Sequence, residues 1–157
     1  MRVEPDYEDM LKSLNLNEVR YCIIGSFALA FHAVPRYTKD MDILVEPTSE
    51  NGNRIVAALN AFGFEELGLT ADDFTEEGKI IPLGYEPVRI DLITSVSGVS
   101  FEAVWQDRVP GVYGRTPTHF ISRNHLITTK RATGRPQDLL DIEMLSALRP
   151  PSVNKQP

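Results

Sequence analysis

The most constraining feature of the sequence is a pair of aspartates, Asp40 and Asp42, which open a short apolar segment ending at Val45. In a strand, side chains two residues apart point to the same face, so the two carboxylates would lie side by side. Adjacent carboxylates repel each other unless a cation lies between them. Their oxygens are hard ligands of the kind that Mg²⁺ takes, together with waters and substrate phosphates. The pattern therefore predicts a metal site; alternatively, both are exposed strand-end residues paired with Arg36 or Lys39.

A glycine–serine step precedes the aspartates. Residues 21–24 form a short apolar run that is typical of a buried strand, and residues 27–34 are apolar helix formers that Pro35 ends. Between them, Gly25 and Ser26 would open the helix, where free backbone N–H groups bind phosphate and a glycine allows close approach. The alternative is a turn glycine followed by a serine N-cap, which is a common arrangement.

A third carboxylate, Asp91, falls in a second apolar segment. Residues 79–83 and 88–94 are predicted to be two strands joined as a hairpin around residues 84–87. In the second strand, Asp91 shares a face with Arg89 and Ile93. A charged side chain inside an apolar strand is a local inconsistency that often marks a functional site.

These motif residues combine in a pattern that resembles the signature of the DNA polymerase β-like nucleotidyltransferases: Gly25-Ser26, thirteen further residues, Asp40-x-Asp42, and Asp91 in a later strand. The local texture, including Arg36 and Thr38, is most similar to the small prokaryotic members related to AbiEii toxins and minimal nucleotidyltransferases. The resemblance implies that the three aspartates are catalytic and bind Mg²⁺ (or Mn²⁺). It also implies that Gly25 and Ser26 hold the β- and γ-phosphates of an NTP.

The resemblance also assigns roles to Arg36 and Thr38, and it extends more weakly to residues 130–141. Arg36 and Thr38 would shape the nucleotide-binding loop, although Arg36 could instead pair with the aspartates. The segment K-R-A-T-G-R-P-Q-D-L-L-D, residues 130–141, resembles a segment found C-terminal to the core in related toxins. In that reading Lys130 reaches the triphosphate, whereas Asp138 and Asp141 give structural support, with Arg135 paired to one of them.

The fold class expected is α/β (α+β): a mixed twisted sheet of about four strands forming a nucleotidyltransferase core, with flanking helices and a helical C-terminal segment. Residues 1–149 are predicted to form a single domain, and residues 150–157 a frayed tail. Helices are predicted at residues 7–16, 50–62, 100–105, 122–133 and 136–148. Residues 65–78 are expected to be a mobile acidic loop, and residues 109–121 a loop with one short strand.

Composition narrows the function class. The chain is 42% hydrophobic and 24% charged, which is ordinary for a globular protein, and no apolar run approaches the roughly 18 residues of a membrane helix. The N-terminus is polar and acidic, unlike a secretory signal, and one cysteine, Cys22, cannot form an intrachain disulfide. We therefore expect a cytoplasmic protein without a membrane partner. The net charge of -6 argues against broad nucleic-acid binding, although residues 108–135 hold six bases and no acid.

The predicted function is metal-dependent transfer of an NMP from an NTP to an acceptor hydroxyl. The resemblance implies an RNA acceptor such as a tRNA 3′ end, or a protein, as for a toxin of a toxin–antitoxin system with a partner antitoxin. A small-molecule acceptor such as an aminoglycoside is also compatible. Two alternatives stay open: a non-catalytic, antitoxin-like module that binds a nucleotide or a partner, and a housekeeping domain with structural aspartates. Motifs of the P-loop, Rossmann and nucleophile-elbow type are absent from the sequence.

Overall fold

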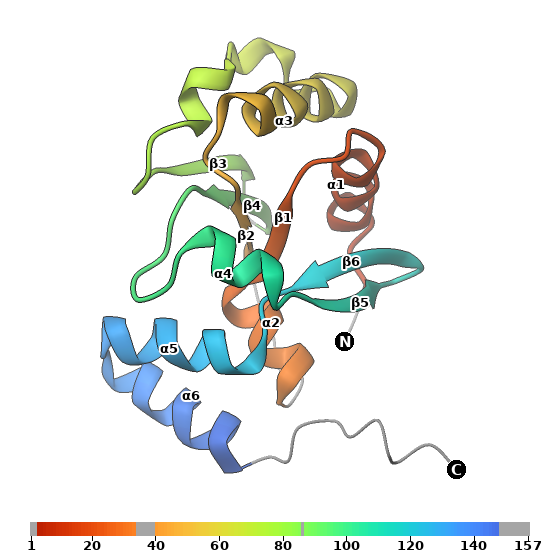
Figure 1. The fold of residues 1–157 in the computed structure, drawn as a ribbon. Helices are drawn as coiled ribbons and strands as arrows, with labels where there is room; N and C mark the ends of the chain where they lie inside the picture. Colours follow the sequence, from red (N-terminus) through yellow and green to blue (C-terminus); the bar gives the residue numbers. More distant parts are fainter. Residues whose placement is uncertain (1–2, 34–39, 86, 148–157) are drawn as a thin grey trace.

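The computed structural model describes residues 3–33, 40–85 and 87–147. Within them, six strands form one sheet in the order β3-β4-β2-β1-β6-β5 (Figure 1). β1 runs antiparallel to β2, which is parallel to β4, so the sheet is mixed. The strands are β1 (Tyr21–Ile24), β2 (Asp40–Val45), β3 (Ile80–Tyr85), β4 (Val88–Ile93), β5 (Val109–Tyr113) and β6 (Thr116–Phe120).

The helices of the described residues begin and end close to where the capping residues predict. They are α1 (Pro5–Leu16), α2 (Gly25–His32), α3 (Ser49–Phe62), α4 (Phe101–Gln106), α5 (Arg123–Thr133) and α6 (Pro136–Ala147). The side chains of Thr48, Ser100 and Ser122 accept the N-cap hydrogen bonds of α3, α4 and α5. Gly63 and Gly134 end α3 and α5 in the left-handed conformation. The predicted α/β class is confirmed.

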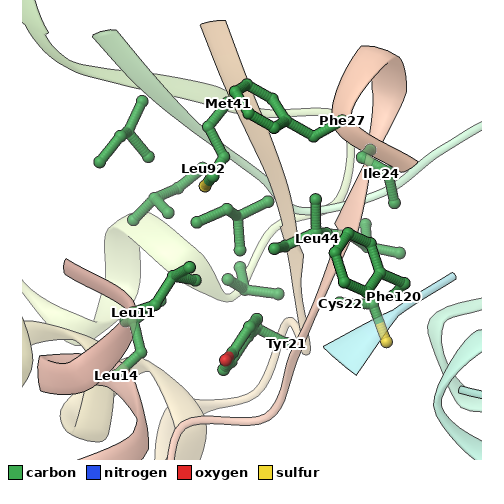
Figure 2. Close-up of a cluster of buried hydrophobic side chains, with 14 of the residues drawn as sticks. Leu11, Leu14, Tyr21, Cys22, Ile24, Phe27, Met41, Leu44, Leu92 and Phe120 are labelled. Carbon is green, nitrogen blue, oxygen red and sulfur yellow. The ribbon is translucent and has the colours of Figure 1, made fainter. Parts of the chain in front are cut away.

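The hydrophobic core lies between the sheet and its helices. Figure 2 shows side chains from α1, β1, β2 and β4 meeting there, and Leu11, Leu14, Tyr21, Met41 and Leu44 are fully buried or nearly so. α1 packs against α3, while α2 contacts β1, β2 and α5, and α5 pairs with α6. This places α2 between the sheet and the α5–α6 pair (Figure 1).

The acidic segment at residues 65–78 was expected to be a mobile loop; the structure shows that it is not wholly a loop, while its mobility stays a prediction. It contains two short 3₁₀ helices, η1 (Glu65–Leu67) and η2 (Ala71–Phe74), and the Phe74 side chain is completely buried. Gly52 of α3 lets the backbone of Ala71 approach closely, because a Cβ at residue 52 would lie 2.7 Å from the Ala71 oxygen. One buried aromatic ring thus anchors a segment whose composition is otherwise that of a loop.

The expectation for residues 109–121 was wrong, and so was the number of strands. The segment forms the β5–β6 hairpin, and β6 joins the sheet parallel to β1 through Ile23 and Phe120. The inward positions of β6 include Thr116 and Thr118, both buried, so the alternation of the strand is not visible as alternating hydrophobicity.

Three further expectations from the sequence concern membrane-spanning helices, Cys22 and the domain boundaries. No helix in residues 3–33, 40–85 and 87–147 is long and apolar enough to cross a membrane. Cys22 is buried, and burial raises the pKa of its thiol to about 12, so it stays a protonated, inert side chain. That residues 1–149 form a single domain stays a prediction, and residues 150–157 lie outside the described part of the chain.

Candidate active site

The register of the parallel pair β2–β4 brings the predicted carboxylates together. Asp42 lies opposite Asp91, and Asp40 lies opposite Arg89. Side chains at paired positions of neighbouring strands share one face of the sheet. The strand pattern therefore predicted the shared face of Asp40 and Asp42, and the tertiary structure adds Asp91 and Arg89 to it. The three carboxylates lie on β2 and β4, two neighbouring strands in the interior of the sheet.

Gly25 lies directly against this acidic face. On the antiparallel side of β2, Asp42 pairs with Ile24, the last residue of β1, and α2 begins at the next residue. Gly25 has a φ of 66°, and a Cβ there would lie 2.5 Å from Oδ2 of Asp42. Both facts require a glycine, because other residues avoid positive φ and the added carbon would collide with the carboxylate.

The start of α2 presents backbone N–H groups beside the acidic face. The first turn holds Gly25 and Ser26, no acidic residue, and no described side chain caps it. The first N–H groups of a helix lack intrahelical partners and carry the positive end of the helix dipole. The α2 start is therefore suited to bind an anion beside Asp42.

The acidic face is electrostatically unbalanced. Burial, followed by repulsion from Asp91 and Asp40, raises the pKa of Asp42 to about 6, and Arg89 only partly opposes this. Oδ1 of Asp40 is buried and has no hydrogen-bond partner in the described part of the chain. Both observations indicate that the site lacks positive charge.

Arg89 supplies part of that charge. Its Nε donates to Oδ1 of Asp91 at 2.9 Å and its Nη2 donates to Oδ2 at 3.0 Å, so the guanidinium engages both carboxylate oxygens. Such two-point pairing is the strongest form of a charged hydrogen bond. Asp91 is 7% exposed.

The residues present fit a divalent cation in chemistry, although not in a preformed arrangement. In residues 3–33, 40–85 and 87–147, no three His, Cys, Asp or Glu side chains form a group that could hold a metal ion as they stand. The fit rests on the donor set: carboxylates on adjacent strands, an orphaned Asp40 oxygen, and a raised Asp42 pKa that a cation would reverse. The pairing of Asp91 with Arg89 is the contact that a metal using all three carboxylates would have to replace.

A pocket of about 290 Å³ opens beside this face. Its lining includes Gly25 and Asp42 from the motif stretch and Lys130 from α5. Arg135 and Asp138, named from the sequence as structural residues, also line it. The sequence did not indicate four further polar lining residues: Ser95 and Ser97 after β4, and Thr129 and Thr133 of α5. The serines stand in a Ser/Gly-rich segment directly after the strand of Asp91, a signal that could have indicated them.

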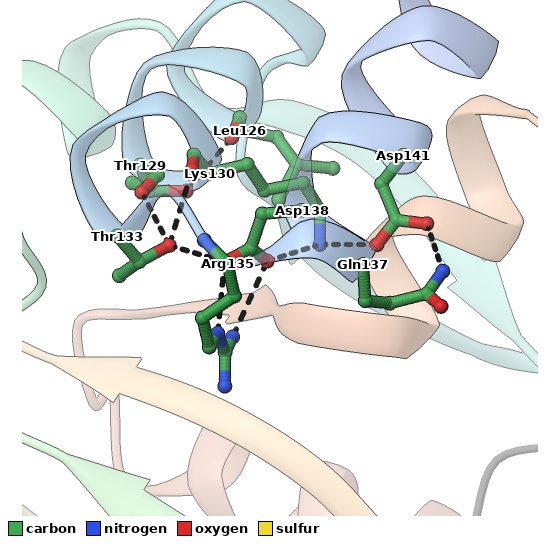
Figure 3. Close-up of polar contacts among 8 residues, drawn as sticks. All are labelled: Leu126, Thr129, Lys130, Thr133, Arg135, Gln137, Asp138 and Asp141. Carbon is green, nitrogen blue, oxygen red and sulfur yellow. Dashed lines mark hydrogen bonds and ion pairs between the residues drawn. The ribbon is translucent and has the colours of Figure 1, made fainter.

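Lys130 lies in a polar network between α5 and α6. Its Nζ is 2.9 Å from Oδ2 of Asp141 and 3.8 Å from Oδ1 of Asp138, as Figure 3 shows. Arg135 donates to Asp138 from its side chain and its backbone, and this hydrogen bonding holds the Asp138 pKa well below its usual range. Asp138 and Asp141 are 2% and 1% exposed. The Arg135–Asp138 pairing that the sequence allowed is present.

The remaining site predictions have mixed outcomes. Gly25, Asp42 and Lys130 meet in one pocket, and Asp91 stands beside Asp42 in the sheet. Arg36 and Thr38 lie outside the described residues, so their roles stay predictions. Away from this site, His32 forms a hydrogen bond with the Ile121 carbonyl and His125 contacts Asp107.

Comparison with known proteins identifies the fold. No family model matches the sequence, and no curated protein matches it. Among solved structures, ANT(2″)-Ia in complex with adenylyl-2″-tobramycin is similar with a TM-score of 0.56 and 13% identity, over 88% of this chain and 84% of that chain. An antigenic nucleotidyltransferase-like protein from Paracoccidioides brasiliensis aligns with a TM-score of 0.47 and 11% identity, over 89% of this chain and 74% of that chain.

The chain therefore has a nucleotidyltransferase type of fold, as the motif residues implied. At this level of identity the likeness concerns the fold. The similarity to AbiEii-type members in particular stays a prediction.

Proposed function

We propose that this protein is a metal-dependent nucleotidyltransferase that moves an NMP from an NTP to an acceptor hydroxyl. One observation carries the proposal: Asp42 and Asp91 face each other across two parallel strands, and Asp42 lies directly against the glycine that opens α2. A paired carboxylate site beside an anion-binding helix start suits a metal–triphosphate ligand. The shared fold with ANT(2″)-Ia supports the same conclusion.

Each group has a role in this scheme. Asp40, Asp42 and Asp91 would hold Mg²⁺ (or Mn²⁺), which neutralises triphosphate charge and favours ionisation of the acceptor hydroxyl when bound. The N–H groups at the α2 start, with the Ser26 hydroxyl, would hold the β- and γ-phosphates. The acceptor hydroxyl would lose its proton, which Asp91 would promote, its oxygen would bond to the α-phosphorus, and the bond to the leaving pyrophosphate would break.

Lys130 would contact the triphosphate across the pocket from α2. Its ammonium group has three donors, so its contact with Asp141 leaves others for a ligand. The Lys130 side chain is 11% exposed and its residue lines the pocket. Asp138 and Asp141 would act on the ligand only by positioning this ammonium group.

For the acceptor, we propose a hydroxyl of a small molecule or a protein ahead of RNA. Half of the six bases in residues 108–135 have partners within the protein: Lys130 and Arg135 are in ion pairs, and the Arg108 guanidinium lies 3.7 Å from the Trp105 ring centre. Less positive charge is thus free to bind a phosphate backbone. The ligand of ANT(2″)-Ia, adenylyl-2″-tobramycin, is a small-molecule example in that protein. A toxin–antitoxin role stays a prediction.

Calorimetric titration with each of the four NTPs, with and without Mg²⁺, tests the proposal. We expect Mg²⁺-dependent binding that Asp40→Asn/Asp42→Asn weakens by at least about a hundredfold, since even indirect metal-site partners are worth 10- to 100-fold. The matched control is Asp6→Asn/Asp9→Asn, the same change on exposed positions of α1. Pyrophosphate release with candidate acceptors then separates an enzyme from a non-catalytic module. Absence of NTP binding by folded wild-type protein would refute the proposal.

A further inference from the structure

We propose that Arg89 is an internal counter-cation of the carboxylate site, and that a divalent ion using all three aspartates must first displace it from Asp91. The inference rests on the function proposed above, because it concerns how that site acquires its metal. It assigns to Arg89 control of metal affinity rather than contact with the reacting atoms.

Arg89 already occupies the Asp91 carboxylate. Arg89 engages both oxygens of Asp91, at 2.9 and 3.0 Å, in the geometry of a planar guanidinium on a carboxylate. A metal ion drawn to the same oxygens would meet the positive charge of the guanidinium at close range. The arginine and the metal therefore compete for one carboxylate, and both cannot have its full charge.

The position of Arg89 in the sheet brings its charge close to the other two aspartates. Arg89 lies opposite Asp40 in the β2–β4 register, and its charge also acts on Asp42. Arg89 therefore lies among the three aspartates that are predicted to bind the metal. This explains why the described residues include no ready-made metal group although three carboxylates share one face of the sheet.

The Arg89 side chain can move away from Asp91 because it is partly exposed to solvent. The Arg89 side chain is 38% exposed, whereas that of Asp91 is 10% exposed. The guanidinium can turn toward water, and it loses little by doing so because an ion pair of a partly exposed side chain is weak. The Asp91 carboxylate is held in place on its strand. Displacement consequently moves the arginine and leaves the ligand geometry in place.

Competition of this kind has a thermodynamic consequence. The apparent metal affinity is the intrinsic affinity reduced by the fraction of molecules in which Asp91 is free. Metal binding by the protein alone is then weak. A metal–triphosphate complex binds better because the phosphates supply further ligands and the α2 start supplies donors for the phosphates.

The test is a titration of the metal-free protein with Mn²⁺, followed by the electron paramagnetic resonance signal of free Mn²⁺. We expect Arg89→Met to lower the Kd about tenfold, which corresponds to about 1.4 kcal/mol. Arg89→Lys, which keeps the charge but not the two-point geometry, should fall between. Arg54→Met is the matched control, since it breaks the exposed Arg54–Glu50 pair of α3, and should leave the Kd unchanged. Circular dichroism establishes that each variant is folded.

A second readout separates displacement from a general charge effect. In the wild-type protein, the Nε–H resonance of Arg89 should report a hydrogen bond without metal and lose it as Mg²⁺ saturates the site. A resonance that stays unchanged at saturation would overturn the inference, as would an equal or weaker Mn²⁺ affinity of Arg89→Met; the proposed function would stand in both cases if Mg²⁺-dependent NTP binding is present. If folded wild-type and Arg89→Met proteins bind no metal, with or without NTP, the proposed function itself fails.

Discussion

Two clusters of aspartates in this protein use the same residue types with opposite results. Between α5 and α6, Asp138 and Asp141 are matched by Lys130 and Arg135. On β2 and β4, three aspartates share a face with Arg89. In the first cluster the Asp138 pKa lies well below its usual range, because hydrogen bonds from Arg135 stabilise the charged form. In the second, burial and repulsion raise the Asp42 pKa to about 6.

The difference shows that a buried carboxylate by itself does not mark a functional site. Asp138 and Asp141 are more deeply buried than Asp91, yet their charges are satisfied within the protein. Asp40 and Asp42 retain an electrostatic deficit that an external cation would fill. A deficit of charge, rather than burial, distinguishes the candidate site from a structural network.

The largest expected effect is a loss of stability when Lys130 is replaced in the cluster between α5 and α6. Lys130→Met leaves the buried Asp138 and Asp141 without their ammonium partner, and breaking a buried pair in this way costs about 3 kcal/mol of unfolding free energy. Urea denaturation measures it. The control is Lys79→Met, which breaks an exposed pair with Glu76 and should cost less than about 1 kcal/mol.

The outcome also sharpens the role of Lys130. A variant of unchanged stability that fails to bind NTP would mean that the lysine serves the ligand and that the network does not depend on it. The contrast between the two clusters would then be lost.

The next effect tests the close approach of Gly25 to the carboxylates. Gly25→Ala should reduce stability by about 2 kcal/mol and impair NTP binding, because it combines a φ of 66° with a Cβ placed 2.5 Å from Asp42. The matched control is Gly68→Ala, at a φ of 65° with nothing within 4 Å of the added carbon. Thermal unfolding of both variants separates backbone strain from the collision. Equal losses of stability in the two variants would show that the Asp42 side chain moves aside at no energetic cost.

The smallest effect is the pH dependence of stability. Asp42 has a pKa of about 6 in the folded protein, above its ordinary value of 3.8, so the folded state holds more protons than the unfolded state between these values. Its contribution to stability therefore falls as pH rises through this window, by about 1 to 2 kcal/mol.

The measurement is the unfolding free energy of metal-free wild type and Asp42→Asn at about pH 4.5 and at about pH 7, on either side of the folded-state pKa of Asp42. From the lower to the higher pH, the unfolding free energy of the wild type should rise less, or fall more, than that of Asp42→Asn. Parallel pH profiles would contradict the raised pKa. Saturating Mg²⁺ should bring the wild-type profile closer to that of the variant.

Much of the fold was readable from local signals. The caps at Thr48 and Ser122 and the stops at Gly63 and Gly134 defined α3 and α5 because each satisfies a specific backbone requirement at a helix end. The β5–β6 hairpin was missed because threonines occupy its inward positions. Phe74 was missed because a single buried ring has no period.

The sequence by itself determined that Asp40 and Asp42 share a face and that a glycine opens the helix before them, since strand period and glycine conformation are local properties. Only the tertiary structure decided which carboxylates meet. The parallel pairing of β2 with β4 placed Asp91 beside Asp42 and put Arg89 among the aspartates. Strand pairing joins residues about fifty positions apart along the chain, and no local pattern encodes its register, because register depends on the packing of the whole sheet.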